Sequence, residues 1–353
     1  MTKIVTTDDN LKNTLKKMPK VDLHVHLDGA LRVQTIWDLA KKMNHPLPVD
    51  NVEDLASKVR VSPDCKSLGD FLATFDVFYP LLKDWDAMNR VAYEFCEDMA
   101  AENACYVEVR FAPVLQEAEG YSMHDVVVSV LNGLEKGGRD FGVDIKIILC
   151  CYRTESPESS IETVKIAKEF LNKGVVAIDL AGFEGAAAHH HSEAFDLAMS
   201  EGIPITIHAG EAGTSENIKE AIHSLGATRI GHGVHLKDDP ELKQLVIDRQ
   251  IPLEMCLTSN VQTQAVSDLD THPFPEYYRS GVYVTLNSDD PGVSNITLTH
   301  ELELVHSRYG LSLEEIAGIE LKGLRAAFAP NETKNKLIDQ YTREFAALGI
   351  EVE

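Results

Sequence analysis

The amino-acid sequence contains no apolar run that approaches the length of a membrane span. Its first 18 residues carry scattered charges and lack the hydrophobic stretch that a signal peptide needs. Its 6 cysteines form no CxxC pair, and several lie inside apolar runs, as is typical of buried, reduced thiols. We therefore expect a soluble cytoplasmic protein with no membrane partner.

Basic residues are also scarce, since 33 lysines and arginines stand against 56 aspartates and glutamates and give a formal net charge of −23. Such a field repels nucleic-acid phosphates and anionic lipids, so we expect no nucleic-acid partner either. A chain of 353 residues can form two domains, but α/β barrels of this size commonly form one.

Eight short apolar runs rich in β-branched residues alternate with helical patterns along the chain. This alternation is typical of an α/β fold in which parallel strands close into a (β/α)8 barrel, the TIM barrel. An open doubly wound sheet would need a glycine-rich turn after the first strand, and the sequence has none there. We therefore predict one barrel domain over residues 1–353. The strands are predicted at Val21–His26, Cys105–Phe111, Ile145–Cys150, Val175–Leu180, Ile203–His208, Thr228–His232, Ile251–Cys256 and Val282–Asn287.

The first and second predicted strands are separated by residues 27–104, far more than a usual connection in such a barrel. Helical patterns occur there at Leu31–Met43, Ser67–Tyr79 and Trp85–Ala101. Because an insertion after the C-terminal end of a strand lies over the barrel mouth, we predict a helical lid or pocket wall, with a stabilising appendage as the alternative. Helical patterns after residue 290 predict the final barrel helix and extra C-terminal helices.

Two helices between strands have clear boundary signals. After the fifth strand, Ser215 is the predicted N-cap and Gly226 the predicted left-handed end of a helix. After the sixth strand, Asp239 is predicted to cap a helix that begins with Pro240.

The ends of the predicted strands carry the residues that suggest chemistry, because function in this fold lies at the C-terminal ends of strands. The first strand ends in His24 and His26, which share one face, the fifth in His208, and the eighth runs into Asp289. Three imidazoles and one carboxylate suit zinc with a free position for water, although cobalt or iron accept the same ligands. Two-metal hydrolases on similar barrels usually need a carboxylated lysine on a middle strand to bridge the metals. No lysine ends the third or fourth predicted strand, so a single-metal site is favoured.

Acid–base groups follow the same strands. His232, between two glycines, could orient or deprotonate a metal-activated water, and Glu211, three residues after His208, could donate a proton. Asp290 could fix a substrate nitrogen, or be only a solvated helix cap. The run His189–His191 is predicted to be exposed and without a catalytic role.

The motifs VDLHVHLDGAL, YVEVRFAP, DLAG, TIHAGE, RIGHG, CLTSN and LNSDDPG occur in this order. Together they cover essentially the whole chain, and the sequence strongly resembles the adenosine deaminase family of the amidohydrolase superfamily. The resemblance implies hydrolysis of adenosine, and of 2′-deoxyadenosine, to inosine and ammonia in purine salvage. It also implies one Zn²⁺ per subunit, held by His24, His26, His208 and Asp289.

The same resemblance implies catalytic roles for three residues: Glu211 protonates purine N1, while His232 and Asp289 position the hydroxide that attacks C6. It further implies a set of substrate-binding residues, which comprises His26, Asp28, Gly182, Asp290, Leu68, Phe71, Leu72 and Phe75. Asp28 would bind the ribose, Gly182 purine N3 and Asp290 purine N7, while the apolar residues would form the wall of the sugar pocket.

One position departs from the family pattern, because Phe183 follows Gly182 where many members have an acidic residue, and Glu184 comes next. The first and seventh strands read HLDG and LTSN, which favours the nucleoside branch over relatives that act on free adenine. The alternatives are a deaminase of another 6-aminopurine, of the adenine, methylthioadenosine or aminofutalosine type, and a barrel that binds nucleoside without turnover.

Overall fold

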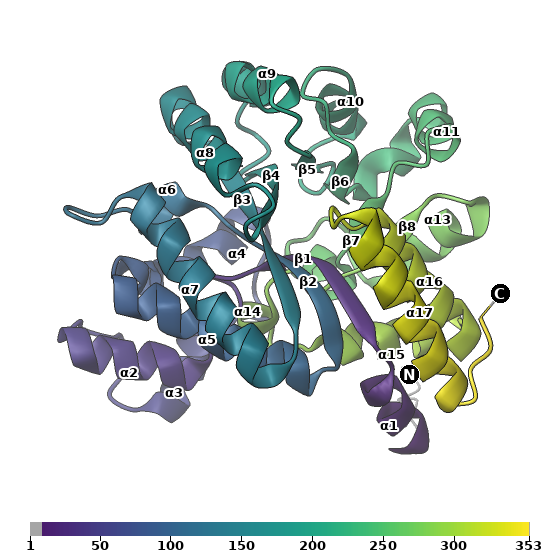
Figure 1. Cartoon of the computed structure of the whole chain (residues 1–353), viewed down its shortest axis with the longest axis horizontal. Helices are drawn as coiled ribbons and strands as arrows, with labels where there is room; N and C mark the ends of the chain where they lie inside the picture. The colour runs from purple at the N-terminus through teal and green to yellow at the C-terminus, as the bar shows by residue number, and fades with distance from the viewer. Residues whose placement is uncertain (1–8, 353) are drawn as a thin grey trace.

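The computed structural model describes residues 9–352, so the expectation for the N-terminal 18 residues lies partly outside the described chain. Eight strands alternate with helices and occupy the centre of the molecule (Figure 1). The strands are β1 (Lys20–His26), β2 (Ala104–Phe111), β3 (Asp144–Tyr152), β4 (Val175–Ala181), β5 (Thr206–Ala209), β6 (Arg229–His232), β7 (Leu253–Met255) and β8 (Val284–Leu286).

The strands form a closed parallel barrel. Two four-stranded parallel sheets, β1 to β4 and β5 to β8, are the halves of the barrel. At one seam Ile178 pairs with Ile205, and the Ile178 N–H donates to the Pro204 carbonyl at 3.0 Å. At the other seam Val25 pairs with Asp289. The predicted (β/α)8 architecture is confirmed.

Burial explains why the strands could be recognised from composition. All seven residues of β4 are buried, as expected for a parallel strand covered by side chains inside the barrel and by helices outside it. The expected start of the fifth strand at Ile203 is wrong, because regular pairing begins at Thr206. Pro204, which has no N–H to donate, interrupts the ladder there.

Helices surround the barrel and extend beyond it (Figure 1). Outside the long insertion they are α1 (Asp9–Lys17), α6 (Pro113–Gln116), α7 (Met123–Phe141), α8 (Pro157–Phe170), η3 (Ala188–His191), α9 (Ser192–Ser200), α10 (Ser215–His223), η4 (Val234–Asp238), α11 (Pro240–Asp248), α12 (Leu257–Gln262), η5 (Leu269–Thr271), α13 (Phe274–Ser280), α14 (Pro291–Ser294), α15 (Leu298–Tyr309), α16 (Leu313–Ala326) and α17 (Asn331–Ala347).

The two predicted helix starts have different outcomes. Asp239 caps α11 as predicted, since its carboxylate accepts the N–H groups of Glu241 and Leu242. The N-cap of α10 is Thr214 and not Ser215, because Thr214 forms a capping box with Asn217. Both residues have a hydroxyl that can cap a helix, so residue type alone could not tell which of the two is the N-cap.

The insertion between β1 and β2 is helical, as predicted. Its elements are α2 (Val33–Met43), α3 (Val52–Val59), α4 (Leu68–Leu72), η1 (Ala73–Val77), η2 (Tyr79–Leu82) and α5 (Trp85–Ala101). The α3 helix was not predicted, and the single helix expected over Ser67–Tyr79 is wrong, since it breaks into α4 and two 3₁₀ turns. Pro80, near the start of η2, cannot continue a regular helix from the preceding turn.

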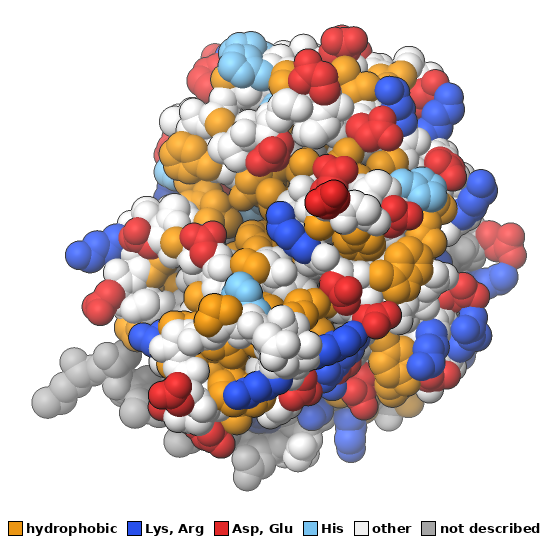
Figure 2. All heavy atoms as spheres, turned by 90° about the vertical axis from the view of Figure 1, so that its left-hand side faces the viewer, with side chains coloured by type: hydrophobic (Ala, Val, Ile, Leu, Met, Phe, Trp, Pro, Cys, Tyr) orange, Lys and Arg blue, Asp and Glu red, His pale blue; other side chains and the backbone are white. Residues whose placement is uncertain are grey.

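Acidic and basic side chains both occur across the face in Figure 2, with apolar side chains between them. Among residues 9–352, no helix combines the length and apolar character needed to cross a bilayer.

Candidate active site

A cluster of imidazoles and one carboxylate lies where the β1/β8 seam meets the end of β5. His24 Nε2 lies 3.0 Å from His208 Nε2, and His26 Nε2 lies 3.2 Å from the same atom. Asp289 Oδ1 lies 3.4 Å from His24 Nε2 and 3.5 Å from His26 Nε2. Ligands about 2.0 Å from a tetrahedral zinc ion are about 3.3 Å apart, so these spacings fit one such ion.

A second grouping of donors overlaps the first, because donor atoms of His24, His208, His232 and Asp289 lie within 4.8 Å of one another. We favour the set with His26, whose Nε2 makes the shorter contacts given above, whereas His232 Nε2 lies 3.5 Å from Glu211 Oε2. His232 and Asp289 both have left-handed backbone angles, with φ of 63° and 60°. Such angles are unfavourable for residues other than glycine and concentrate at functional sites.

Buried carboxylates orient two of these histidines. His24 Nδ1 lies 2.8 Å from Glu254 Oε2, and His208 Nδ1 lies 2.8 Å from Asp179 Oδ2. Arg110 contacts both carboxylates, Glu254 at 2.8 Å and Asp179 at 3.1 Å. With Nδ1 occupied, each imidazole presents Nε2 to the centre of the cluster, which is how buried partners prepare metal ligands. No sequence pattern predicts these partners, although Asp179 opens the DLAG motif.

Hydrogen bonds assign the protons of His232. The Phe274 N–H donates to His272 Nδ1 at 3.1 Å, so the ring proton of neutral His272 is on Nε2, which lies 3.2 Å from Asn260 Oδ1. The Asn260 amide nitrogen then faces His232 Nδ1 at 3.0 Å. Since Nδ1 of His232 accepts this bond, neutral His232 carries its proton on Nε2.

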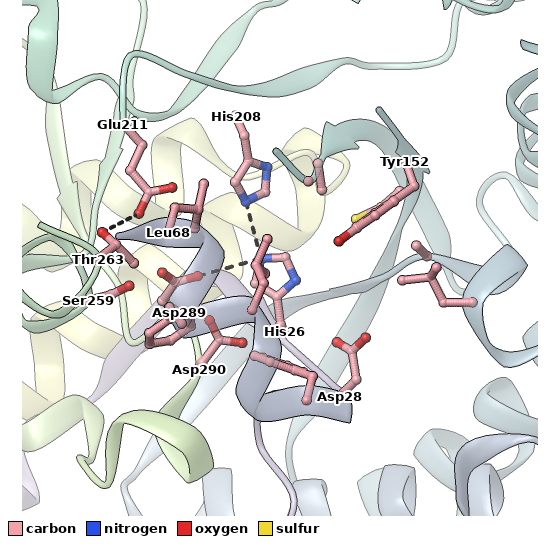
Figure 3. Close-up of a pocket in the computed structure, with 18 of the residues that line it drawn as sticks. His26, Asp28, Leu68, Tyr152, His208, Glu211, Ser259, Thr263, Asp289 and Asp290 are labelled. Carbon is pink, nitrogen blue, oxygen red and sulfur yellow. Dashed lines mark hydrogen bonds and ion pairs between the residues drawn. The ribbon is translucent and has the colours of Figure 1, made fainter. Parts of the chain in front are cut away.

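Glu211 is held in a form suited to donating a proton. Burial, followed by the charges of Asp289 and Glu184, raises the pKa of Glu211 to about 8. The Thr263 hydroxyl donates to Glu211 Oε1 at 2.9 Å (Figure 3). The other oxygen, Oε2, lies 3.5 Å from His232 Nε2. Thr263 was missed because it belongs to no recognised motif.

Two further carboxyl groups have an oxygen without a protein partner. Oδ1 of Asp28 and Oδ1 of Asp290 are both buried and unpaired, although Tyr79 and Gln116 donate to the other oxygen of Asp28, at 3.1 and 3.3 Å. Burial raises the pKa of Asp28 to about 6. Burial and the nearby charge of Asp289 raise the pKa of Asp290 well above its usual range. Asp290 is therefore not a solvated cap but a buried group in need of a partner.

These groups surround one cavity at the mouth of the barrel (Figure 3). All the residues proposed from sequence line it except His24, which is fully buried behind it. The predicted residues that line it are His26, Asp28, Leu68, Phe71, Leu72, Phe75, Gly182, His208, Glu211, His232, Asp289 and Asp290. Tyr79, Leu115, Cys150, Tyr152, Ser259 and Thr263 are among the lining residues that sequence reasoning missed.

The loop after β4 explains the departure at Phe183. Gly182 has φ of 94°, and a Cβ there would lie 3.0 Å from the Tyr152 ring, so glycine is required. The Phe183 side chain points outward and is 49% exposed, whereas Glu184 turns inward and is 5% exposed. The charge absent at position 183 is thus present one residue later.

The histidine run after β4 is only partly as predicted. His189 and His190 are exposed, but His191 is 1% exposed, which contradicts the prediction for that residue. Its Nδ1 lies 2.8 Å from the Ser160 hydroxyl and its Nε2 lies 3.2 Å from the Arg153 carbonyl. His191 is therefore a packing residue with both nitrogens satisfied.

The fold and the site define a class: a (β/α)8-barrel hydrolase with a buried His/Asp cluster able to bind a metal at the barrel mouth. A family model described as adenosine deaminase matches residues 19–343. The chain is 43% identical to adenosine deaminase of Clostridium botulinum (strain Okra / Type B1) over 333 residues, which are 94% of this chain and 99% of that protein. The chain belongs to the adenosine deaminase family, as its motifs predict.

Solved structures agree with this assignment. Adenine deaminase from Arthrobacter aurescens superposes with a TM-score of 0.84 at 28% identity, covering 92% of this chain and 98% of that one. The N6-methyl-AMP deaminase from Arabidopsis thaliana gives a TM-score of 0.83 at 30% identity, covering 94% of this chain and 98% of that one. These two relatives have the same fold but are named for different purine substrates, adenine and N6-methyl-AMP. The fold therefore does not identify the substrate, which has to be inferred from the residues of the cavity.

Proposed function

We propose that this hydrolase is a zinc-dependent enzyme that deaminates adenosine, and 2′-deoxyadenosine, to inosine and ammonia in cytoplasmic purine salvage. The observation that carries the proposal is the convergence of three imidazole nitrogens and one carboxylate oxygen beside a carboxyl group that is protonated near neutral pH. Glu211 and three of the four cluster residues, His26, His208 and Asp289, line one cavity.

His24, His26, His208 and Asp289 would hold the zinc ion. Imidazole and carboxylate donors at these spacings suit this metal, and His26, His208 and Asp289 also line the cavity that a substrate would enter. When bound, zinc lowers the pKa of a water molecule from 15.7 to about 7 and so supplies a nucleophile at neutral pH.

The remaining residues would handle protons and orientation. Glu211, protonated on Oε2, donates to purine N1, which makes C6 electrophilic toward water. His232 donates from Nε2 and therefore orients the attacking oxygen, which leaves Asp289 as the group that accepts its proton. Asp290, protonated because its pKa is raised, donates to purine N7, and the Gly182 N–H meets N3. The nitrogen at C6 then takes up the proton that Asp289 accepted and leaves as ammonia, while the oxygen on C6 gives its remaining proton to Glu211 and becomes the carbonyl of inosine.

The charge of the cavity supports a nucleoside rather than a nucleotide. Four carboxyl groups line the cavity, and its described lining contains no lysine or arginine. A 5′-phosphate carries nearly two negative charges and would find no lysine or arginine there to pair with, whereas Asp28 is a carboxyl group that is left free to ionise. Asp28, with its unpaired Oδ1, can accept a neutral sugar hydroxyl. The apolar wall of Leu68, Phe71, Leu72 and Phe75 gives a sugar a place that free adenine would leave empty.

The test is an ultraviolet assay with adenosine, adenine, methylthioadenosine and AMP, before and after chelation and zinc replacement. We expect zinc-dependent loss of the adenosine spectrum and little turnover of AMP. Turnover of AMP at the rate of adenosine would refute the argument from charge. If zinc is bound and none of the four compounds is turned over, the enzymatic proposal is refuted in favour of a barrel that binds nucleoside without turnover.

The proton donor is tested by Glu211→Gln, with Glu216→Gln on the exposed start of α10 as the matched control. Glu211→Gln should lower kcat by about 10²- to 10⁴-fold while nucleoside binding persists, because general acid catalysis contributes that much. The control should behave as the parent does. Near-full activity of Glu211→Gln would show that another group protonates the purine.

A further inference from the structure

We infer that Glu184 is a positioning residue for Glu211: its carboxylate holds the backbone of the loop after β5 so that the acid reaches the substrate nitrogen. The inference deepens the proposed function and rests on it for the role of Glu211. Nothing in the motifs singles out Glu184, because the family pattern draws attention to the position before it, which Phe183 occupies here.

Glu184 joins two neighbouring loops of the barrel mouth. Its Oε1 accepts the backbone N–H of Glu211 at 3.3 Å, and its Oε2 accepts the backbone N–H of Gly213. One buried carboxylate from the loop after β4 therefore binds the amide of the acid itself and the amide two residues further on. Hydrogen bonds to a charged acceptor are roughly twice as strong as neutral ones, which suits a rigid attachment.

The surroundings of this carboxylate show that the space is built for it. A Cβ on Gly213 would collide with Glu184 Oε2, so glycine at that position lets the carboxylate reach the amide. The buried Arg153 guanidinium donates to the His208 carbonyl at 2.8 Å and to the Ala186 carbonyl at 3.4 Å. Burial lowers the pKa of Arg153 and the Glu184 charge opposes that effect, so the guanidinium serves as the buried counter-charge.

The acid is thus fixed at two points. Thr263 holds the Glu211 side chain through Oε1, and Glu184 holds its main chain. A proton donor works only within hydrogen-bond reach of its target, and a displacement of about 1 Å can cost about 10²-fold in rate. Loss of Glu184 should therefore slow the step that uses the acid without changing how the nucleoside binds.

The experiment is a double-mutant cycle in zinc-loaded enzyme with adenosine. Glu184→Ala should lower kcat by about 10- to 100-fold with KM within about twofold, and Glu184→Gln, which keeps one acceptor oxygen, should restore part of the loss. Phe183→Ala, at the exposed neighbouring residue, is the matched control and should leave kcat unchanged. In a Glu211→Gln background, Glu184→Ala should have no further effect, because residues that act as a unit are not additive.

A purely structural role gives a different pattern, since Glu184→Ala would then lower kcat equally in both backgrounds, and that result overturns the inference. Amide hydrogen exchange of a peptide spanning residues 209–214 provides a readout without turnover. Exchange should be faster in Glu184→Ala, and also in Gly213→Ala, whose new methyl group displaces the carboxylate. If the parent fails to deaminate adenosine but exchange still responds, the proposed function is wrong and the attachment stands; unchanged exchange refutes the attachment.

Discussion

Replacing Asp179 tests whether a buried carboxylate prepares His208 to bind metal. Three side chains approach a single oxygen of this carboxylate: Oδ2 lies 2.8 Å from His208 Nδ1, 3.1 Å from Arg110 Nη1 and 3.5 Å from Cys150 Sγ. Oδ1 has no partner. Burial would raise the pKa of Asp179, but His208 and Arg110 outweigh burial and hold it well below its usual range. The carboxylate is therefore charged at every pH of interest.

The expected loss of zinc affinity follows from the fact that only one oxygen of Asp179 has partners. In Asp179→Asn the amide oxygen can take the place of Oδ2 and the amide nitrogen the place of the unpaired Oδ1, so the acceptor survives and only the charge is lost. We expect zinc affinity to fall about 10-fold, or about 1.4 kcal/mol. Asp179→Ala removes the acceptor as well, and we expect a fall of about 100-fold, or about 2.7 kcal/mol.

The assay is competition for zinc between the apoprotein and a chromophoric chelator of known affinity. Asp144→Asn, in a partly exposed pair with Lys146 at the start of β3, is the control and should bind zinc as the parent does. Urea unfolding of the apoproteins separates metal affinity from stability. Parent-like affinity in a folded Asp179→Ala protein would refute the idea that Asp179 orients the ligand.

Three other predictions concern the metal, stability and the histidine run. Asp289→Ala should lose bound zinc on dialysis, and full occupancy by elemental analysis would contradict the ligand assignment. Burial raises the pKa of Glu301 from 4.5 to about 7, so the folded state binds this proton more tightly than the unfolded chain and stability falls as pH rises between those values. Glu301→Gln should abolish about 3 kcal/mol of that fall in urea unfolding, whereas Glu332→Gln on the surface should not. Serine at both His189 and His190 should leave kcat unchanged, and a large loss would give that exposed pair a role.

The sequence predicted what local pattern can reveal. Buried parallel strands leave continuous apolar runs, and alternation along β1 places His24 and His26 on one face, so the barrel and a cluster of histidines with an aspartate could both be predicted. The residues that form hydrogen bonds with the site side chains could not be predicted. Glu254, Thr263 and Glu184 contact residues 230, 52 and 27 positions away in the sequence, and no spacing rule connects them.

Predictions of local structure were wrong where several residues could satisfy the same geometry. Either Thr214 or Ser215 can cap a helix, and only the capping box with Asn217 decides between them. Likewise, His191 differs from His189 only in which way a 3₁₀ turn points it. Such choices depend on packing rather than on propensity.

The seam between β1 and β8 has a consequence for biogenesis. The His26 N–H donates to the Asp289 carbonyl at 2.7 Å and the Asp289 N–H donates to the His24 carbonyl at 2.9 Å, so the strands that close the barrel also bring ligands together. In the proposed zinc site, the two histidines of β1 leave the ribosome early and form only a chelating pair until β8 follows. We therefore expect high-affinity zinc binding only after nearly the whole polypeptide has been translated.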